Sequence, residues 1–72
     1  MYEVNRYFGS VASISYLNAG EQVGEYDSQE AAIEVAKACA REAGYTYLVS
    51  CQGYEVGVAI HNGGLPAKFL MA

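Results

Sequence analysis

Cysteine and histidine are the side chains of this sequence best suited to nucleophilic catalysis. Two cysteines and one histidine occur, and Cys51 and His61 lie in neighbouring strand-like segments. A thiol is activated when a histidine lies within hydrogen-bond reach of it. A turn at Gly53-Tyr54 predicts that His61 lies opposite Thr46, roughly 16 Å from Cys51 and on the other face of the sheet. We therefore expect no catalytic residue and no enzymatic activity.

The same three side chains are too few for a metal site. Structural zinc sites use four ligands, usually with paired spacings such as Cys-x-x-Cys, and no such pair occurs. The glycines form no phosphate-binding loop between a strand and a helix. We predict neither metal nor cofactor. Cys39 and Cys51 are expected to be buried thiols, with a disulfide between them as the alternative that geometry leaves open.

The element with the clearest signals is an α-helix over residues 27–44. Asp27 predicts its N-cap, Glu30 completes a capping box, and Gly44 is placed to be the left-handed residue at its end. One face of this helix is charged. The opposite face is small enough to pack closely on a sheet, and it consists of Ala32, Ala36, Cys39 and Ala43.

Strand-like segments lie on both sides of the helix. Residues 10–17 and 22–26 flank a hairpin turn, and residues 2–8 extend the first of these strands. In this arrangement Ala12, Ile14 and Tyr16 face the helix. Residues 45–52 and 55–61 form a second hairpin. Its predicted core face carries Tyr47, Val49, Cys51, Val56, Val58 and Ile60.

Together these elements predict an α+β fold in which a single helix packs on one face of a four- or five-stranded antiparallel sheet (β-β-α-β-β). Residues 1–72 form one domain of a size near the lower limit for a self-supporting core. The apolar segment 65–72 has three interpretations: a fifth edge strand, a docked tail or a partner-contacting arm.

Composition and charge limit the partners that this chain can have. It is 53% hydrophobic and 17% charged, as globular chains are, and its net charge is −4. Four scattered cations cannot form the basic stripe that nucleic-acid binding requires. An acidic chain suits a protein partner with a basic surface. With no signal-peptide pattern and no apolar run of about 20 residues, we expect a cytoplasmic protein without membrane contact.

Acidic residues are concentrated around the start of the predicted helix. They form either a solvated face that caps the helix or a patch presented to a basic groove. The candidate partner-binding residues are Glu25, Tyr26, Asp27, Glu30, Ile33, Glu34 and Tyr54. Apolar residues on the outer sheet face and in the tail indicate a homodimer as a further expectation.

In layout and helix composition the chain resembles the small phage-encoded anti-CRISPR proteins. The resemblance is carried by Gly24-Glu-Tyr-Asp-Ser-Gln-Glu-Ala-Ala, by the helix through Ala43-Gly44, and by Tyr47-Leu-Val-Ser. It implies a non-enzymatic inhibitor that binds a CRISPR-Cas effector complex in the host cell cytoplasm and blocks its interaction with nucleic acid. It assigns no site residues. The alternative is a small structural or dimerisation module of a phage or bacterium.

Overall fold

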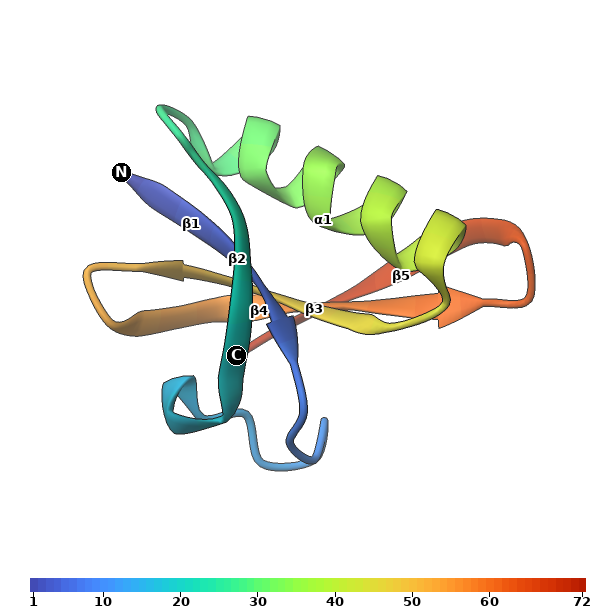
Figure 1. Cartoon of the computed structure of the whole chain (residues 1–72), viewed down its shortest axis with the longest axis horizontal. Helices are drawn as coiled ribbons and strands as arrows, with labels where there is room; N and C mark the ends of the chain where they lie inside the picture. Colours follow the sequence, from blue (N-terminus) through green and yellow to red (C-terminus); the bar gives the residue numbers. More distant parts are fainter.

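One α-helix lies across a five-stranded antiparallel sheet in the computed structural model, which describes all residues 1–72 (Figure 1). The strand order is β2-β1-β3-β4-β5. This arrangement confirms the predicted α+β fold, and residues 65–71 form the fifth strand, at an edge. The elements are β1 Tyr2–Tyr7, the 3-10 helix η1 Tyr16–Asn18, β2 Ala19–Tyr26, α1 Gln29–Ala43, β3 Thr46–Cys51, β4 Tyr54–Asn62 and β5 Leu65–Met71.

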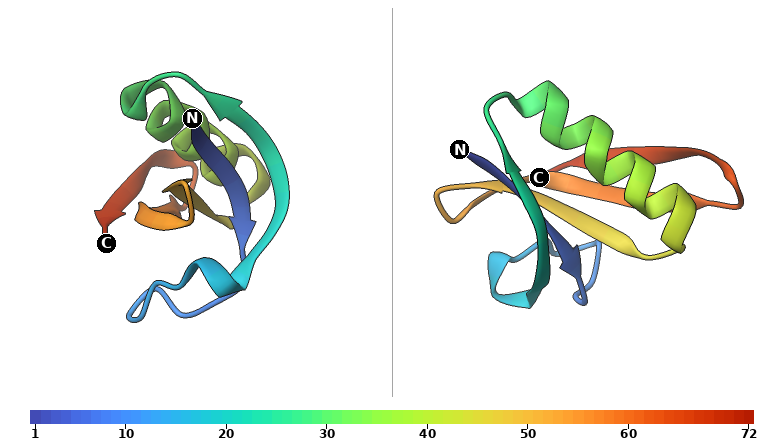
Figure 2. Two further views of the ribbon diagram at one scale, coloured as in Figure 1. Left: turned by 90° about the vertical axis from the view of Figure 1, so that its left-hand side faces the viewer. Right: turned by 45° about the horizontal axis from the view of Figure 1, so that its top comes forward.

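The strand order explains why a helix follows β2. Strands β2 and β3 both pair antiparallel with β1, which lies between them, so they run parallel to each other. Parallel strands cannot be joined by a tight turn and need a crossover connection. Helix α1 makes this connection across β1 and covers one face of the sheet (Figure 2).

The helix packs on the sheet through alanines spaced four residues apart. Ala32, Ala36 and Ala40 are fully buried. On the sheet side they meet Val4, Tyr47, Val49, Ala59 and Ala67, and these eight residues form the main core. Its larger side chains all come from the sheet. The sequence prediction named Cys39 and Ala43 in place of Ala40. It was wrong about Ala43, which is exposed, whereas Cys39 is half-buried and packs against this core.

The helix begins one residue later than predicted. Ser28, not Asp27, is the N-cap, and its hydroxyl accepts a hydrogen bond from Ala31 N–H at 3.1 Å. The predicted end is confirmed, because Gly44 has φ 79° and donates its N–H to the Ala40 carbonyl at 3.0 Å. Only a residue without Cβ adopts this left-handed conformation at little cost.

The hairpin of β3 and β4 corrects the predicted register. Its turn residues are Gln52 and Gly53, with φ of 52° and 81°, the conformation that closes two-residue hairpins. A bulge beyond the turn leaves Tyr47 paired with Ala59. Since a one-residue shift moves a side chain to the other face, Ala59 joins the main core, whereas Val58 and Ile60 point away from the helix.

The segment predicted as a strand over residues 10–17 is mostly an irregular loop that ends in η1. It packs on the face of the sheet away from α1 (Figure 1), where Tyr7, Leu48 and Val58 form a second buried cluster. Ile14 and Tyr16 contact this second cluster and not the helix. The outer face is therefore partly covered, and Leu48, one of the apolar residues of that face, is fully buried.

Both cysteines are unpaired, and each is half-buried, where the sequence led us to expect full burial. Neither α1 nor η1 is long and apolar enough to cross a membrane.

Candidate functional site

The structure separates the residues that were considered for chemistry. Cys51 pairs with Tyr54 beside the turn of the second hairpin, whereas His61 lies near the other end of β4. His61 Nδ1 lies 2.9 Å from the Ala40 carbonyl oxygen, to which it donates in the Nδ1-protonated tautomer. His61 therefore faces the helix, as Cys51 does, and the expectation of opposite faces was wrong. The structure brings together no three histidine, cysteine or acidic side chains that could hold a metal ion.

A row of carboxylates crosses four strands on the face away from the helix. Glu25 of β2 lies opposite Glu3 of β1, Glu3 lies opposite Ser50 of β3, and Ser50 lies opposite Glu55 of β4. Glu25 is exposed, and Glu3 and Glu55 are half-buried. Residues directly opposite each other in antiparallel strands have Cβ atoms about 5 Å apart. The row therefore places three carboxylates and one serine hydroxyl along one line.

A row of tyrosines crosses the same strands on the helix face. It runs through Tyr26, Tyr2, Cys51 and Tyr54, each opposite the next. Tyr2 and Tyr26 are half-buried and pack against the main core. Tyr54 is 78% exposed and is free to contact a partner.

The two rows occupy adjacent positions of the same strands, on opposite faces of the sheet. The ends of these strands lie near the start of α1, at one end of the molecule (Figures 1 and 2). Asp27 and Glu30 lie at this end because they follow β2 and open the helix. Five of the eight acidic residues of the chain are gathered there. We name this surface the acidic end, and it consists of Glu3, Glu25, Asp27, Glu30, Glu55 and the exposed Tyr54.

No side-chain cation lies at the acidic end. The four cations of the chain are Arg6, Lys37, Arg41 and Lys68. The Arg6 guanidinium stacks at 3.6 Å from the centre of the Tyr45 ring and at 4.7 Å from that of Phe8, at the other end of β1. Stacking of this kind holds a guanidinium in place by its attraction to aromatic faces.

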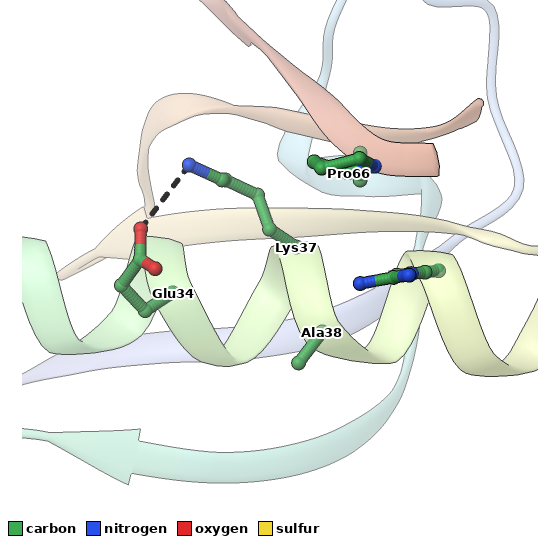
Figure 3. Close-up of a pocket in the computed structure, with 6 residues that line it drawn as sticks. Glu34, Lys37, Ala38 and Pro66 are labelled. Carbon is green, nitrogen blue, oxygen red and sulfur yellow. Dashed lines mark ion pairs between the residues drawn. The ribbon is translucent and has the colours of Figure 1, made fainter. Parts of the chain in front are cut away.

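Glu34 and Ile33 were predicted in the same site, but the structure does not bring them to the acidic end. Glu34 Oε2 lies 3.1 Å from Lys37 Nζ in a shallow groove between α1 and β5 (Figure 3). Arg41 lines the same groove and donates from Nε to the Gly64 carbonyl at 2.8 Å. Ile33 packs against the main core.

No side-chain ion pair compensates the carboxylates of the acidic end. The Glu34–Lys37 contact is the one ion pair of the structure, and it lies outside this end. Glu3 and Glu25 are direct neighbours, and like charges in this position destabilise a sheet. Within the row, Glu55 Oε2 accepts a hydrogen bond from Tyr16 N–H at 2.8 Å, while the hydroxyl of the fully buried Ser50 has no partner.

Sequence reasoning missed Glu3 and Glu55 because they are far from the helix in the chain. The signal that finds them is the strand order, which places β1 beside β2 and β4 beside β3. No protein-family model, curated protein or solved structure was found to match this chain.

Proposed function

We propose that this chain is a small non-enzymatic inhibitor that binds a lysine- and arginine-rich protein surface through its acidic end. The observation that carries the proposal is the row of Glu25, Glu3 and Glu55, which contains no side-chain cation and runs along the β2-β1-β3-β4 part of the sheet. Arrangements that destabilise a fold without a local compensating gain are typical of functional sites. A cationic partner would supply the side-chain cations that the chain itself lacks at this end.

The shape of the acidic end supports a protein partner more than a free ion. Its carboxylates are spread along a strand row instead of converging on one point, and no metal-binding group forms. Tyr54 stands at the edge of this surface and is largely exposed. Tyrosine is a common interface anchor because it offers a large contact area at a low cost in conformational entropy.

The specific form of this function that we propose is the anti-CRISPR one. CRISPR effector complexes hold nucleic acid in positively charged channels. A row of carboxylates presented by a rigid sheet can occupy such a channel in place of phosphates, and the complex then loses access to its target DNA. In this proposal the chain acts in the cytoplasm of the host cell.

Competition for DNA tests the proposal directly. Purified CRISPR effector complexes are incubated with labelled target DNA, and bound DNA is measured by fluorescence anisotropy as the chain is added. We expect DNA to be displaced from at least one complex type, with the displacement weakening as salt rises. If no complex loses DNA, the anti-CRISPR form is wrong.

A matched pair of charge reversals tests the acidic end itself. Glu25→Lys reverses a charge within the row, and Glu42→Lys makes the same change at an exposed residue near the end of α1. We expect Glu25→Lys to weaken inhibition roughly tenfold or more, mostly through slower association, and Glu42→Lys to leave it nearly unchanged. Equal effects of the two reversals would mean that net charge, not the acidic end, governs binding.

A further inference from the structure

The two edges of the sheet differ in their capacity to pair with another strand. The edge strand β2 shifts register twice against β1, and bulges of this kind keep an edge from pairing. The other edge strand, β5, pairs with β4 without interruption from Lys68 to Met71. Strand β5 also carries none of the acidic residues of the chain. Its free edge thus lacks carboxylates and is regular from Lys68 onward, beyond Pro66 and a register shift against β4.

The free edge of β5 presents unpaired main-chain groups. Ala72 N–H donates to the Val56 carbonyl at 2.9 Å, so the amides of β5 alternate from that point between β4 and the outside. By this alternation the N–H and C=O groups of Phe69 and Met71 point outward. Apolar side chains accompany them, since Leu70 is 41% exposed and Met71 is 63% exposed.

We propose that β5 pairs antiparallel with β5 of a second copy of this chain, about a two-fold axis at Leu70. Phe69 then lies opposite the partner's Met71, and Met71 lies opposite the partner's Phe69. Every outward N–H and C=O of these residues finds a partner in this register, which gives four main-chain hydrogen bonds. The two five-stranded sheets become one continuous sheet.

The side chains that face each other in this register favour a second copy of the chain as the partner strand. On the face away from the helix, Leu70 meets the partner's Leu70. On the helix face, Phe69 lies opposite the partner's Met71, while its ring covers Gly57 of its own β4. Lys68, the one charged residue of β5, lies opposite the partner's Ala72, so no like charges face each other. Each copy has a net charge of −4, but β5 carries no carboxylate, so two copies can approach each other along this edge with little electrostatic repulsion.

Light scattering with a matched pair of leucine variants tests the interface. The parent is expected to have a dimer mass at high micromolar concentration. Leu70→Lys places two ammonium groups at the axis and should weaken the dimer at least roughly tenfold. Leu17→Lys makes the same change at a leucine of η1 that is 92% exposed and outside β5, and it should dimerise as the parent does. A monomeric parent, as expected if the edge binds a different protein's strand, would overturn the proposal, and so would a Leu70→Lys variant that dimerises as tightly as the parent.

Disulfide trapping tests the register independently of any loss of folding. In a background in which Cys39 and Cys51 are replaced by alanine, Leu70→Cys places two thiols across the axis. This is a non-hydrogen-bonded pair with Cα atoms about 4.5 Å apart, which a disulfide can span. We expect oxidation to yield a covalent dimer at least about tenfold faster than with Lys68→Cys, whose thiol lies opposite the partner's Ala72. Equal rates for the two variants would overturn the register.

Discussion

The buried hydroxyl of Tyr7 organises a stretch of chain that has no strand partner. It accepts a hydrogen bond from Ser15 N–H at 3.1 Å and lies 3.0 Å from the Ser10 carbonyl, to which it donates. Its ring packs with Leu48 and Val58 in the second cluster. One side chain therefore ties the loop to the sheet and helps bury the apolar groups beneath it.

Removing this hydroxyl while keeping the ring isolates its contribution. Tyr7→Phe leaves the Ser15 N–H without its partner, and we expect the free energy of unfolding to fall by about 1–2 kcal/mol. Tyr54→Phe removes the hydroxyl of an exposed ring and should change it by less than about 0.5 kcal/mol. Urea denaturation of both variants measures the difference. A Tyr7→Phe variant as stable as the parent would show that water replaces these hydrogen bonds at no cost.

Cys39 of α1 and Tyr47 of β3 make stability sensitive to alkaline pH. Burial raises the pKa of the Cys39 thiol. Burial also raises the pKa of Tyr47, with a further rise from Cys39 nearby and an opposing effect of Arg6. A group whose pKa is raised by folding holds its proton more tightly in the native state. Its contribution is complete at neutral pH and is lost as the pH rises above the unfolded values, about 8.5 for cysteine and about 10 for tyrosine.

We therefore expect the free energy of unfolding to fall between about pH 8 and pH 10.5. Urea denaturation at a series of pH values measures this decline. Replacing Cys39 with alanine removes the thiol and should flatten the first part of the curve, near about pH 8.5–9.5. A parent whose stability is constant over this range would contradict the assignment.

Helix α1 was the most predictable element because its signals are local. Its alanine face, its charged residues and Gly44 all lie within one stretch of chain, and the structure places the helix there. The error of one residue at its start has a local cause too. Asp27 and Ser28 are both good N-cap residues, and only the path of the chain leaving β2 decides which of their side chains reaches the first free amides.

This choice of N-cap predicts unequal effects of two neighbouring substitutions. Ser28→Ala removes the acceptor of the Ala31 N–H and should cost about 1 kcal/mol of stability. Asp27→Ala removes only a favourable charge near the start of the helix and should cost about 0.3 kcal/mol. Thermal denaturation of the two variants decides between the caps. A larger loss at Asp27 would return the N-cap to the position that the sequence alone predicts.

The loop over residues 10–17 and the β3–β4 turn could not be predicted from local pattern. Alternating small and apolar residues in this loop imitate a strand, but its polar groups are satisfied by the distant Tyr7 and Glu55. At the turn, both Gln52-Gly53 and Gly53-Tyr54 contain the glycine that a tight hairpin requires. The structure places a non-glycine residue, Gln52, at positive φ, and this shifts the register of everything after it.

At the scale of the whole molecule, five of the eight acidic residues are gathered at one end of the fold, the acidic end. Glu25, Asp27 and Glu30 could be grouped from the sequence because they are near neighbours in the chain. Glu3 and Glu55 join them only through the order β2-β1-β3-β4. Strand order depends on long-range pairing, for which this sequence holds no local signal. The candidate site was therefore half predictable, and its strongest feature, the Glu3–Glu25 opposition, was not predictable at all.

This opposition should cost stability, and removing it should reveal the cost. Glu25→Gln keeps the shape of the side chain and ends the repulsion with Glu3, so the free energy of unfolding should rise by roughly 0.2–1 kcal/mol at low salt. The same substitution at Glu34 removes a carboxylate paired with Lys37 and should produce a small loss. Added salt should stabilise the parent more than Glu25→Gln, since it screens the same repulsion. If Glu25→Gln is more stable and also binds the basic partner less tightly, the acidic end exchanges stability for binding. If it is less stable than the parent, the two carboxylates do not repel each other. The repulsion between Glu3 and Glu25 could then no longer be used as an argument that the acidic end is a binding site.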